Sequence, residues 1–347
     1  QPAGRLRALT FLTLFLTFDL VLFGAFTRLT DSGLGCPDWP GCYGNASPLG
    51  AQADIHAAQT AMPTGPVTHG KAWVEMLHRY LATAVGVLIT VLALASWLHA
   101  RQRQTSISPW WATATLVWVC LQGAFGALTV TMKLYPAIVT GHLLGGIGLL
   151  LLLAVQSQGF APAPLQLTRR LYMMAAMVMV LTLVQIVLGG WVSTNYAVLA
   201  CSDFPTCQGT WWPPMDFGHG FTWLRELGAG KDGAYLPFAA LTAIHVVHRL
   251  GAVVLLTAVA GLAWQLHRSG DPALRRWALV IGAAALWQLA SGMSNVVLGW
   301  PLLAALAHTG GAAVLASLLA VLLARAHASS GWTQLAPLER RVPVAAS

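Results

Sequence analysis

Apolar residues fall in eight long blocks along the chain, separated by polar or charged stretches. The blocks cover about 7–27, 72–98, 109–131, 137–157, 170–193, 238–266, 273–298 and 301–325. Each is long enough to cross the hydrocarbon core of a bilayer, which takes about 20 apolar residues in a helix. Lipid offers backbone groups no hydrogen-bond partner, so runs of this length form helices rather than strands. The pattern predicts an all-α polytopic membrane protein with eight transmembrane helices.

Composition and charge agree with this class and add an orientation. Of the 347 residues, 56% are hydrophobic and 9% are charged. A net charge of +8 could point to nucleic acid, but the arginines gather at alternate ends of the predicted helices, which marks those ends as cytoplasmic. They are Arg5, Arg7, Arg101, Arg103, Arg169, Arg170, Arg268, Arg275, Arg276, Arg325, Arg340 and Arg341. We expect a multi-pass protein of a bacterial cytoplasmic (inner) membrane, with both termini cytoplasmic, membrane lipid around it and no nucleic-acid partner.

The two longest loops fall on the opposite, periplasmic side and carry cysteine pairs with the same spacing. The first reads CPDWPGC at 36–42 and the second CSDFPTC at 201–207. Cysteines oxidise outside the cytoplasm, so we predict one disulfide within each loop. A zinc site shared by the four cysteines is the alternative. The predicted pairs are Cys36–Cys42 and Cys201–Cys207.

The repeat extends beyond the cysteines. The pair His78-Arg79 aligns with His248-Arg249, and GHLLGG at 141–146 aligns with AHTGG at 307–311. Four helices return the chain to its starting side, so the two halves share one orientation. We therefore predict two tandem four-helix bundles, formed by residues 1–160 and 161–347.

Each half has one histidine in its second helix and one in its fourth. At 1.5 Å per residue, all four lie roughly 10–16 Å below the outer helix ends. Polar side chains are costly inside a membrane and mark functional paths. Two imidazoles at one depth fit the axial ligands of a haem iron, whereas histidines hydrogen-bonded in a polar core are the alternative. The predicted pairs are His78 with His142 and His248 with His308.

Residues beside these histidines suit the same kind of site. Arg79 and Arg249 each follow a predicted ligand, and we expect them to contact haem propionates. Snorkelling of the two arginines to the membrane interface is the alternative. Nearby glycines are expected to let a flat macrocycle approach a helix, with tight helix packing as the other explanation. These glycines are Gly141, Gly145, Gly146, Gly310 and Gly311.

The halves differ at one chemically important position. Glu75 precedes His78 by three residues and shares its helix face, whereas the matching position before His248 is His245. A Glu-x-x-His pair also occurs in di-iron bundles, but those need several carboxylates. The asymmetry predicts that one haem is the substrate and the other a cofactor, with Glu75 as the catalytic acid-base or charge-stabilising group. A purely structural carboxylate is the alternative.

Taken together, these motifs resemble the haem A synthase family (CtaA/Cox15). The resemblance rests on FTRLTDSGLGCPDWPGCYG (26–44), EMLHRYLA (75–82), GHLLGG (141–146), HRLGA (248–252) and AHTGG (307–311). It implies an oxidoreductase that oxidises the C8 methyl group of haem O, through a hydroxymethyl stage, to the formyl group of haem A used by cytochrome oxidase. It also implies haem O synthase and an unidentified electron donor as partners.

The resemblance assigns a role to each half. It implies that substrate haem O lies between His78 and His142, near Glu75, and that a haem b cofactor lies between His248 and His308. Two other functions remain open. A di-haem b carrier from quinol to cytochrome would use the same ligands without forming a product, and a transporter would explain the tandem halves without haem.

Overall fold

The computed structural model describes residues 2–102, 107–160 and 163–329, so Arg103, Arg340 and Arg341 lie outside the described residues. Eight helices in this part of the chain are long and apolar enough to cross a membrane, which confirms the predicted number. They are α1 (Pro2–Leu29), α3 (His69–Arg101), α4 (Pro109–Thr131), α5 (Pro136–Ser157), α6 (Arg169–Thr194), α8 (Phe238–Arg268), α9 (Pro272–Val297) and α10 (Leu302–Ser329).

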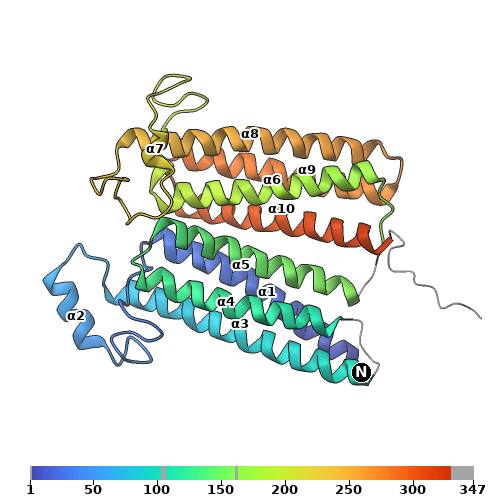
Figure 1. Cartoon of the computed structure of the whole chain (residues 1–347), viewed down its shortest axis with the longest axis horizontal. Coiled ribbons are helices and arrows are strands. Elements are labelled where there is room, and N and C mark those ends of the chain that lie inside the picture. The colour runs from blue at the N-terminus through green and yellow to red at the C-terminus, as the bar shows by residue number, and fades with distance from the viewer. Residues whose placement is uncertain (1, 103–106, 161–162, 330–347) are drawn as a thin grey trace, which may run out of the picture.

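Four shorter elements complete the described chain, which contains no β-strand. Helix α2 (Gln52–Ala61) lies in the first long loop, and η2 (Ala197–Leu199) and α7 (Phe217–Gly220) lie in the second. A short 3-10 helix, η1 (Gln158–Phe160), follows α5. Figure 1 shows α2 and α7 at the same end of the molecule, away from the N-terminus of α1. Both cysteine loops therefore share one end, as a tandem repeat requires, while their placement in the periplasm stays a prediction.

The local sequence sets where the long helices begin. The side-chain oxygens of Thr68, Thr168 and Asp271 accept first-turn N–H groups of α3, α6 and α9, which satisfies donors that have no partner inside the helix. Helices α4, α5 and α9 also carry proline in the first turn, where its missing N–H costs nothing. The predicted helix ends consequently differ from the observed ones by about five residues or fewer.

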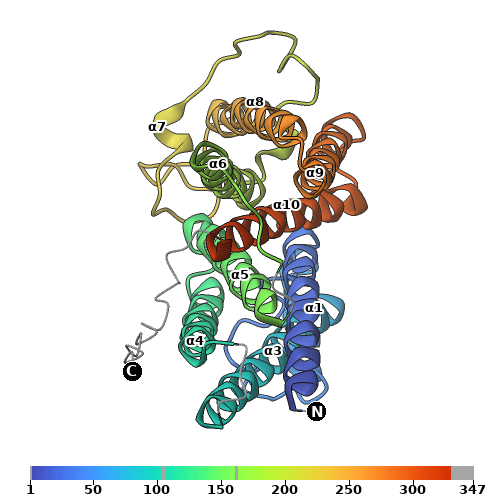
Figure 2. The ribbon, with the colours of Figure 1, turned by 90° about the vertical axis from the view of Figure 1, so that its right-hand side faces the viewer.

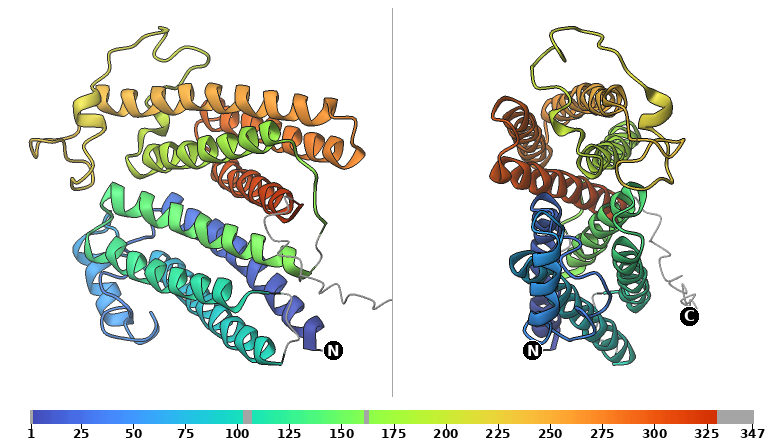
Figure 3. Two further views of the ribbon diagram at one scale, coloured as in Figure 1. Left: turned by 45° about the vertical axis from the view of Figure 1, so that its right-hand side comes forward. Right: turned by 90° about the vertical axis from the view of Figure 1, so that its left-hand side faces the viewer.

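The eight helices form two four-helix bundles. In the first, α1 packs on α3, α3 on α4, α4 on α5, and α5 returns to α1; in the second, α6, α8, α9 and α10 repeat this order. Figures 2 and 3 show the two bundles side by side, with α10 of the second next to α1 and α5 of the first. Helix α6 also packs on α5. The predicted tandem bundles are thus observed, and their inner helices meet around a shared interface.

Each bundle has its own apolar core, and a third apolar cluster joins them. Ile89 and Leu153 are fully buried in the first bundle, and Leu262 and Ile281 in the second. Val21, Ile147, Ile186 and Ala313 form a cluster across the interface. These four residues come from the inner helices α1, α5, α6 and α10, one from each.

Candidate functional site

One cavity of about 870 Å3 occupies the interior and extends from the first bundle into the second. Residues of both cysteine loops line it as well, among them Trp39, Pro40, Phe204 and Pro205. The residues that the sequence singled out as chemically important therefore share one cavity. They are Glu75, His78, Arg79, His142, His245, His248, Arg249 and His308.

The four predicted ligands lie at a similar depth. His78 is nine residues after the start of α3, His142 six after that of α5, His248 ten after that of α8, and His308 six after that of α10. These offsets correspond to about 9–15 Å along the helices. Within each bundle the two imidazoles line the same cavity. The predicted pairs thus share one space, and iron ligation by them stays a prediction.

A glycine on the preceding spanning helix faces each of these imidazoles. A Cβ atom added at Gly24 would lie 3.1 Å from Cε1 of His78, and one at Gly189 would lie 3.2 Å from Cε1 of His248. The same relation joins Gly126 to His142 (3.3 Å) and Gly292 to His308 (3.1 Å). A larger residue at any of these positions would displace the imidazole that it faces. We call Gly24, Gly126, Gly189 and Gly292 the cradle glycines. Sequence reasoning missed this role, although the repeat aligns Gly24 with Gly189 and Gly126 with Gly292.

The glycines that the sequence proposed for haem approach have other neighbours. A Cβ at Gly145 would clash with Gln122, and one at Gly311 with Gln288 and Trp287. Gly141 faces Phe125 on α4, and Gly310 faces Leu22 on α1. Among the five, Gly146 lines the central cavity. Tight helix packing therefore explains the other four, which corrects their expected role.

The rings differ in how their Nδ1 atoms are held. The amide nitrogen of Gln185 lies 3.0 Å from Nδ1 of His248, and the hydroxyl of Ser291 lies 3.0 Å from Nδ1 of His308. In the first bundle, Gln122 lies 3.1 Å from Nδ1 of His142. Nδ1 of His78 is buried and has no hydrogen-bond partner in the described part of the chain. The repeat explains this difference, because the position equivalent to Gln185 is the apolar Leu20.

Both arginines bind the backbone of the neighbouring cysteine loop. Arg79 donates to the carbonyl oxygens of Cys36 (3.5 Å), Asp38 (2.8 Å) and Gly41 (2.5 Å). Arg249 donates to the three equivalent carbonyls, those of Cys201 (3.0 Å), Asp203 (2.8 Å) and Thr206 (2.8 Å). Neither arginine simply snorkels, since each ties a loop to a spanning helix. Contact with a propionate stays a prediction.

Each loop is closed by a disulfide and by an aspartate. Cys36 is bonded to Cys42 and Cys201 to Cys207, with Cα–Cα distances of 4.9 and 4.7 Å. The described residues contain no cluster of three or more His, Cys, Asp or Glu that could hold a metal ion, so the shared zinc site finds no support there. The carboxylate of Asp38 accepts the N–H groups of Tyr43 (2.6 Å) and Gly44 (2.8 Å).

The second loop repeats this capping arrangement with Asp203, which is half-buried, as Asp38 is. Asp203 accepts the N–H groups of Gln208 (2.7 Å) and Gly209 (3.0 Å) and the hydroxyl of Thr206 (2.5 Å). The hydroxyl of Thr206, followed by these backbone N–H groups, lowers the pKa of Asp203 from 3.8 to about 2. The carboxylate of Asp203 therefore stays ionised over the whole physiological range.

Glu75 has structural partners as well as a place on the cavity wall. Its side chain is 4% exposed, accepts the N–H of Cys36 at 2.8 Å and forms an ion pair with Arg79. His245, the equivalent residue, lies 3.0 Å from the carbonyl oxygen of Ala197 through Nδ1. One bundle thus places an acid at the rim of the cavity, while the other places an imidazole there.

Polar contacts join the two bundles near the loops. Arg28 donates to the carbonyl of Ser193 at 2.7 Å and stacks over the ring of Tyr196 at 4.1 Å. The hydroxyl of Tyr196 donates to Asp31 at 2.6 Å. The sequence repeat aligns Arg28 with Ser193 and Asp31 with Tyr196, so the bundles meet through equivalent positions.

Comparison with known proteins gives a consistent result. Residues 7–320 match the profile of the COX15-CtaA family, described as cytochrome oxidase assembly protein. The chain is 37% identical over 309 residues to a protein of Shewanella oneidensis named heme A synthase, covering 88% of this chain and 91% of that protein. Proteins with the same name from Methylobacterium sp. (strain 4-46) and Halalkalibacterium halodurans are 29% and 26% identical, over 95% and 83% of this chain and 93% and 86% of theirs.

Proposed function

Since this chain belongs to the COX15-CtaA family, we propose that it is a haem A synthase, an oxidoreductase that converts the C8 methyl group of haem O to the formyl group of haem A. Its curated relatives carry that enzyme's name along nearly the whole chain. The observation that carries the proposal is the single cavity with two histidine pairs, of which one has a carboxylate beside it. An electron carrier without a product gives no reason for that difference.

The residues present fit two haem groups. The donor set is four imidazoles, the ligand that most often holds haem iron. The cradle glycines let each ring pack directly against a neighbouring helix, and the cavity reaches all four rings. We assign His248 and His308 to a resident haem b, which when bound supplies one-electron transfer, and His78 and His142 to substrate haem O.

The fixation of the rings supports this division of roles. A hydrogen bond to the second ring nitrogen of a histidine fixes its orientation and strengthens its binding of a metal. In the second bundle both rings have such a partner, Gln185 or Ser291, as a permanently bound group requires. In the first bundle His78 has none in the described part of the chain. A histidine whose ring orientation is less firmly fixed suits a substrate haem, which must enter and leave the site.

Glu75 is positioned to serve the oxidation in the first bundle. Removing electrons from a methyl group at the edge of a porphyrin builds positive charge and releases protons, which a nearby carboxylate stabilises or accepts. Arg79 contacts Oε1 of the Glu75 carboxylate, and the N–H of Cys36 donates to Oε2. A carboxylate oxygen has two lone pairs, so Oε2 keeps one to take a proton while the bond from Cys36 persists.

Arg249 has capacity left for a propionate. A guanidinium has five N–H groups, and the loop carbonyls take three hydrogen bonds from Arg249. Arg79 donates through both terminal nitrogens to four loop carbonyls and to Glu75, so a propionate would have to take the place of one of these partners. Both arginines also line the cavity. We propose that Arg79 contacts the propionates of the substrate and Arg249 those of haem b. The two disulfide loops would then shape the outer end of both haem sites.

The placement of the protein in the cell follows from the same assignment. We propose that it spans the bacterial inner membrane with both termini cytoplasmic and the cysteine loops periplasmic, as the arginine distribution predicts. The substrate, haem O, is apolar and would pass through the bilayer from a haem O synthase. A separate redox partner must exchange electrons with the enzyme.

Haem extraction tests the proposed function directly. Purified protein should yield haem b together with haem O, its hydroxylated derivative or haem A when the extract is separated by chromatography. Two equivalents of haem b and no oxidised product would identify an electron carrier instead. Protein without any haem would favour a transporter.

A further inference from the structure

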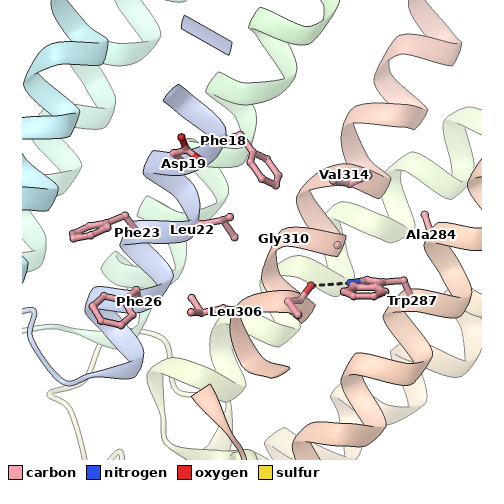
Figure 4. Close-up of a pocket in the computed structure, with 12 residues that line it drawn as sticks. Phe18, Asp19, Leu22, Phe23, Phe26, Ala284, Trp287, Leu306, Gly310 and Val314 are labelled. Carbon is pink, nitrogen blue, oxygen red and sulfur yellow. Dashed lines mark hydrogen bonds between the residues drawn. The ribbon is translucent and has the colours of Figure 1, made fainter. Parts of the chain in front are cut away.

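A second, separate groove lies on the side of α1 and α10 that faces away from the central cavity. It encloses about 810 Å3 and is lined by residues of α1, α9 and α10. In Figure 4, Phe18 and Leu22 project from α1 toward α10, with Trp287 and Ala284 on the opposite wall. The groove therefore bridges the two bundles, and nothing in the haem chemistry described above uses it.

One charged residue, Asp19, stands in this otherwise apolar groove. Asp19 and Glu75 are the acidic residues within the eight spanning helices. Asp19 lies ten residues before the outer end of α1, about 15 Å along the helix and thus near the middle of a core about 30 Å thick. Unlike Glu75, it has no hydrogen-bond or ion-pair partner among the described residues. An unpaired carboxylate at this depth is costly and marks a functional site.

The lining defines the ligand by its chemistry. Its walls are phenylalanine, leucine, alanine, glycine, valine and one tryptophan, so the ligand must be largely apolar and suits aromatic contacts. The indole N–H of Trp287 already donates to the carbonyl of Ala307 at 3.0 Å (Figure 4). Asp19 is then the polar side chain left to be satisfied, and a carboxylate needs a donor. Phospholipid head groups lie at the membrane surface and acyl chains carry no donor.

The groove is also connected to the predicted haem b site. Ser291 donates to the carbonyl of Trp287 at 2.7 Å, and its hydroxyl lies 3.0 Å from Nδ1 of His308. Gln288, next to Trp287, donates to the carbonyl of His308 at 3.0 Å. One turn of α9 therefore links Trp287 in the groove to Ser291, which contacts a predicted iron ligand. This proximity favours a redox-active ligand over an inert lipid.

We propose that the groove of Phe18, Asp19, Leu22, Trp287, Gly310 and Val314 binds a membrane quinol, whose hydroxyl donates a hydrogen bond to Asp19 and whose ring packs on the aromatic walls. A quinol joins a flat ring and an O–H donor to a long apolar tail, which matches the lining. The choice of a redox ligand rests on the proposed function. With O2 as the oxidant, each hydroxylation of the methyl group also takes up two electrons and two protons, which a quinol releases as it becomes a quinone. The groove and its carboxylate are independent of that function.

The test is equilibrium binding of radiolabelled decyl-benzoquinol to the purified, haem-containing protein in lipid nanodiscs, kept anaerobic and reduced. Binding should saturate at one quinol per chain. Because asparagine offers an uncharged acceptor in place of the carboxylate, Asp19→Asn should weaken quinol binding about tenfold or more. The wild-type protein should prefer decyl-benzoquinol to decyl-benzoquinone, which has no O–H donor, and Asp19→Asn should remove that preference.

A matched pair of variants controls for general effects on the fold. Val314→Trp fills the groove and should reduce quinol binding more than tenfold. Val280→Trp makes the same change on α9 at a residue of similar exposure, 47% against 42%, outside the groove, and should bind as the wild type does. Equal binding by both variants, no saturable binding, or equal affinity for quinol and quinone in the wild type would overturn the proposal.

Other occupants give different results. If haem O competed with the quinol, the groove would hold the substrate. If Val314→Trp converted a dimer to a monomer without changing quinol affinity, the groove would be a contact between two copies of the chain. Haem extraction from the same preparations separates the two claims: haem A without quinol binding refutes the groove alone, and quinol binding without any oxidised haem refutes the proposed function alone.

Discussion

The two bundles are built on the same plan and differ at the places where their chemistry should differ. Both hold a disulfide loop through one arginine and three equivalent carbonyls, and both set each predicted ligand against a glycine. Among the described residues, the first bundle has Glu75 and a ring, that of His78, whose Nδ1 has no partner, whereas the second has His245 and two ligand rings whose Nδ1 atoms have partners. A duplicated scaffold can therefore serve a substrate in one copy and a cofactor in the other through a few substitutions.

The largest expected effect comes from removing the ligands of one bundle. His248→Ala or His308→Ala should abolish the low-spin spectrum of haem b, since an iron with one axial ligand loses that signature. His78→Ala and His142→Ala should keep the spectrum of haem b and lose haem A. Absorption spectra of the purified variants decide this, and the reverse pattern would exchange the roles of the bundles.

Exchanging Gln185, which faces His248, and Leu20, its equivalent near His78, should test this difference between the bundles. Gln185→Leu gives the second bundle the residue of the first and should weaken retention of haem b roughly 10–100-fold. Leu20→Gln introduces the missing amide beside His78 and should slow release of the product without changing haem b. Transfer of haem to a scavenger protein measures the first effect, and single-turnover kinetics measures the second. Unchanged retention in Gln185→Leu would show that the amide does not hold the ring.

The cradle glycines should give smaller and bundle-specific effects. An added methyl group at Gly189 or Gly24 displaces the facing ring by a few tenths of an ångström and should cost about 1–3 kcal/mol. Gly189→Ala should shift the spectrum of haem b, whereas Gly24→Ala should lower the haem A yield and leave that spectrum unchanged. Gly261→Ala and Gly86→Ala, whose Cβ atoms would meet nothing within 4 Å, are the matched controls. A spectral shift in a control variant would argue against the cradle.

The smallest effect concerns the second cysteine loop and its pH dependence. The pKa of Asp203 is lowered in the folded protein, from 3.8 to about 2. Stabilisation of the loop by this carboxylate is therefore complete above about pH 4 and disappears as the pH falls through about 2. Hydrogen exchange of the Gln208 and Gly209 amides, corrected for its intrinsic rate, should accelerate over that window. In Asp203→Asn it should already be fast at pH 6. Protection that is equal in both proteins would exclude the carboxylate as the cap.

The sequence predicted the architecture well because membrane helices leave a strong signal. Apolar length determines a spanning helix, and the repeat of His78-Arg79 at His248-Arg249 places the bundles in tandem. The main function of the arginines was missed, since binding to loop carbonyls depends on backbone that returns from about 40 residues away. The cradle glycines were missed because a glycine that faces a ring looks, in sequence, like any glycine of a membrane helix.

The acid beside the first histidine pair was predicted, but its partners were not. Glu75 stood out because its spacing to His78 places both on one helix face. Its bond from Cys36 joins residues that are 39 positions apart, and no local pattern reports such a contact. Among the described residues, Nδ1 of His78 has no partner because the residue of α1 that matches Gln185 is Leu20. The sequence reveals this difference only after the contact of Gln185 with His248 is known.

The central claim, that the first bundle transforms a haem which the second bundle only helps to oxidise, is tested most directly by Glu75→Gln. The change keeps the size of the side chain and its bond from Cys36 but removes the negative charge and the proton acceptor. The measurement is the ratio of haem A to haem b extracted from membranes, with His245→Gln as the matched change in the second bundle. The account predicts normal haem b with stalled haem O in Glu75→Gln and near-normal haem A in His245→Gln. Near-normal haem A in Glu75→Gln would contradict it.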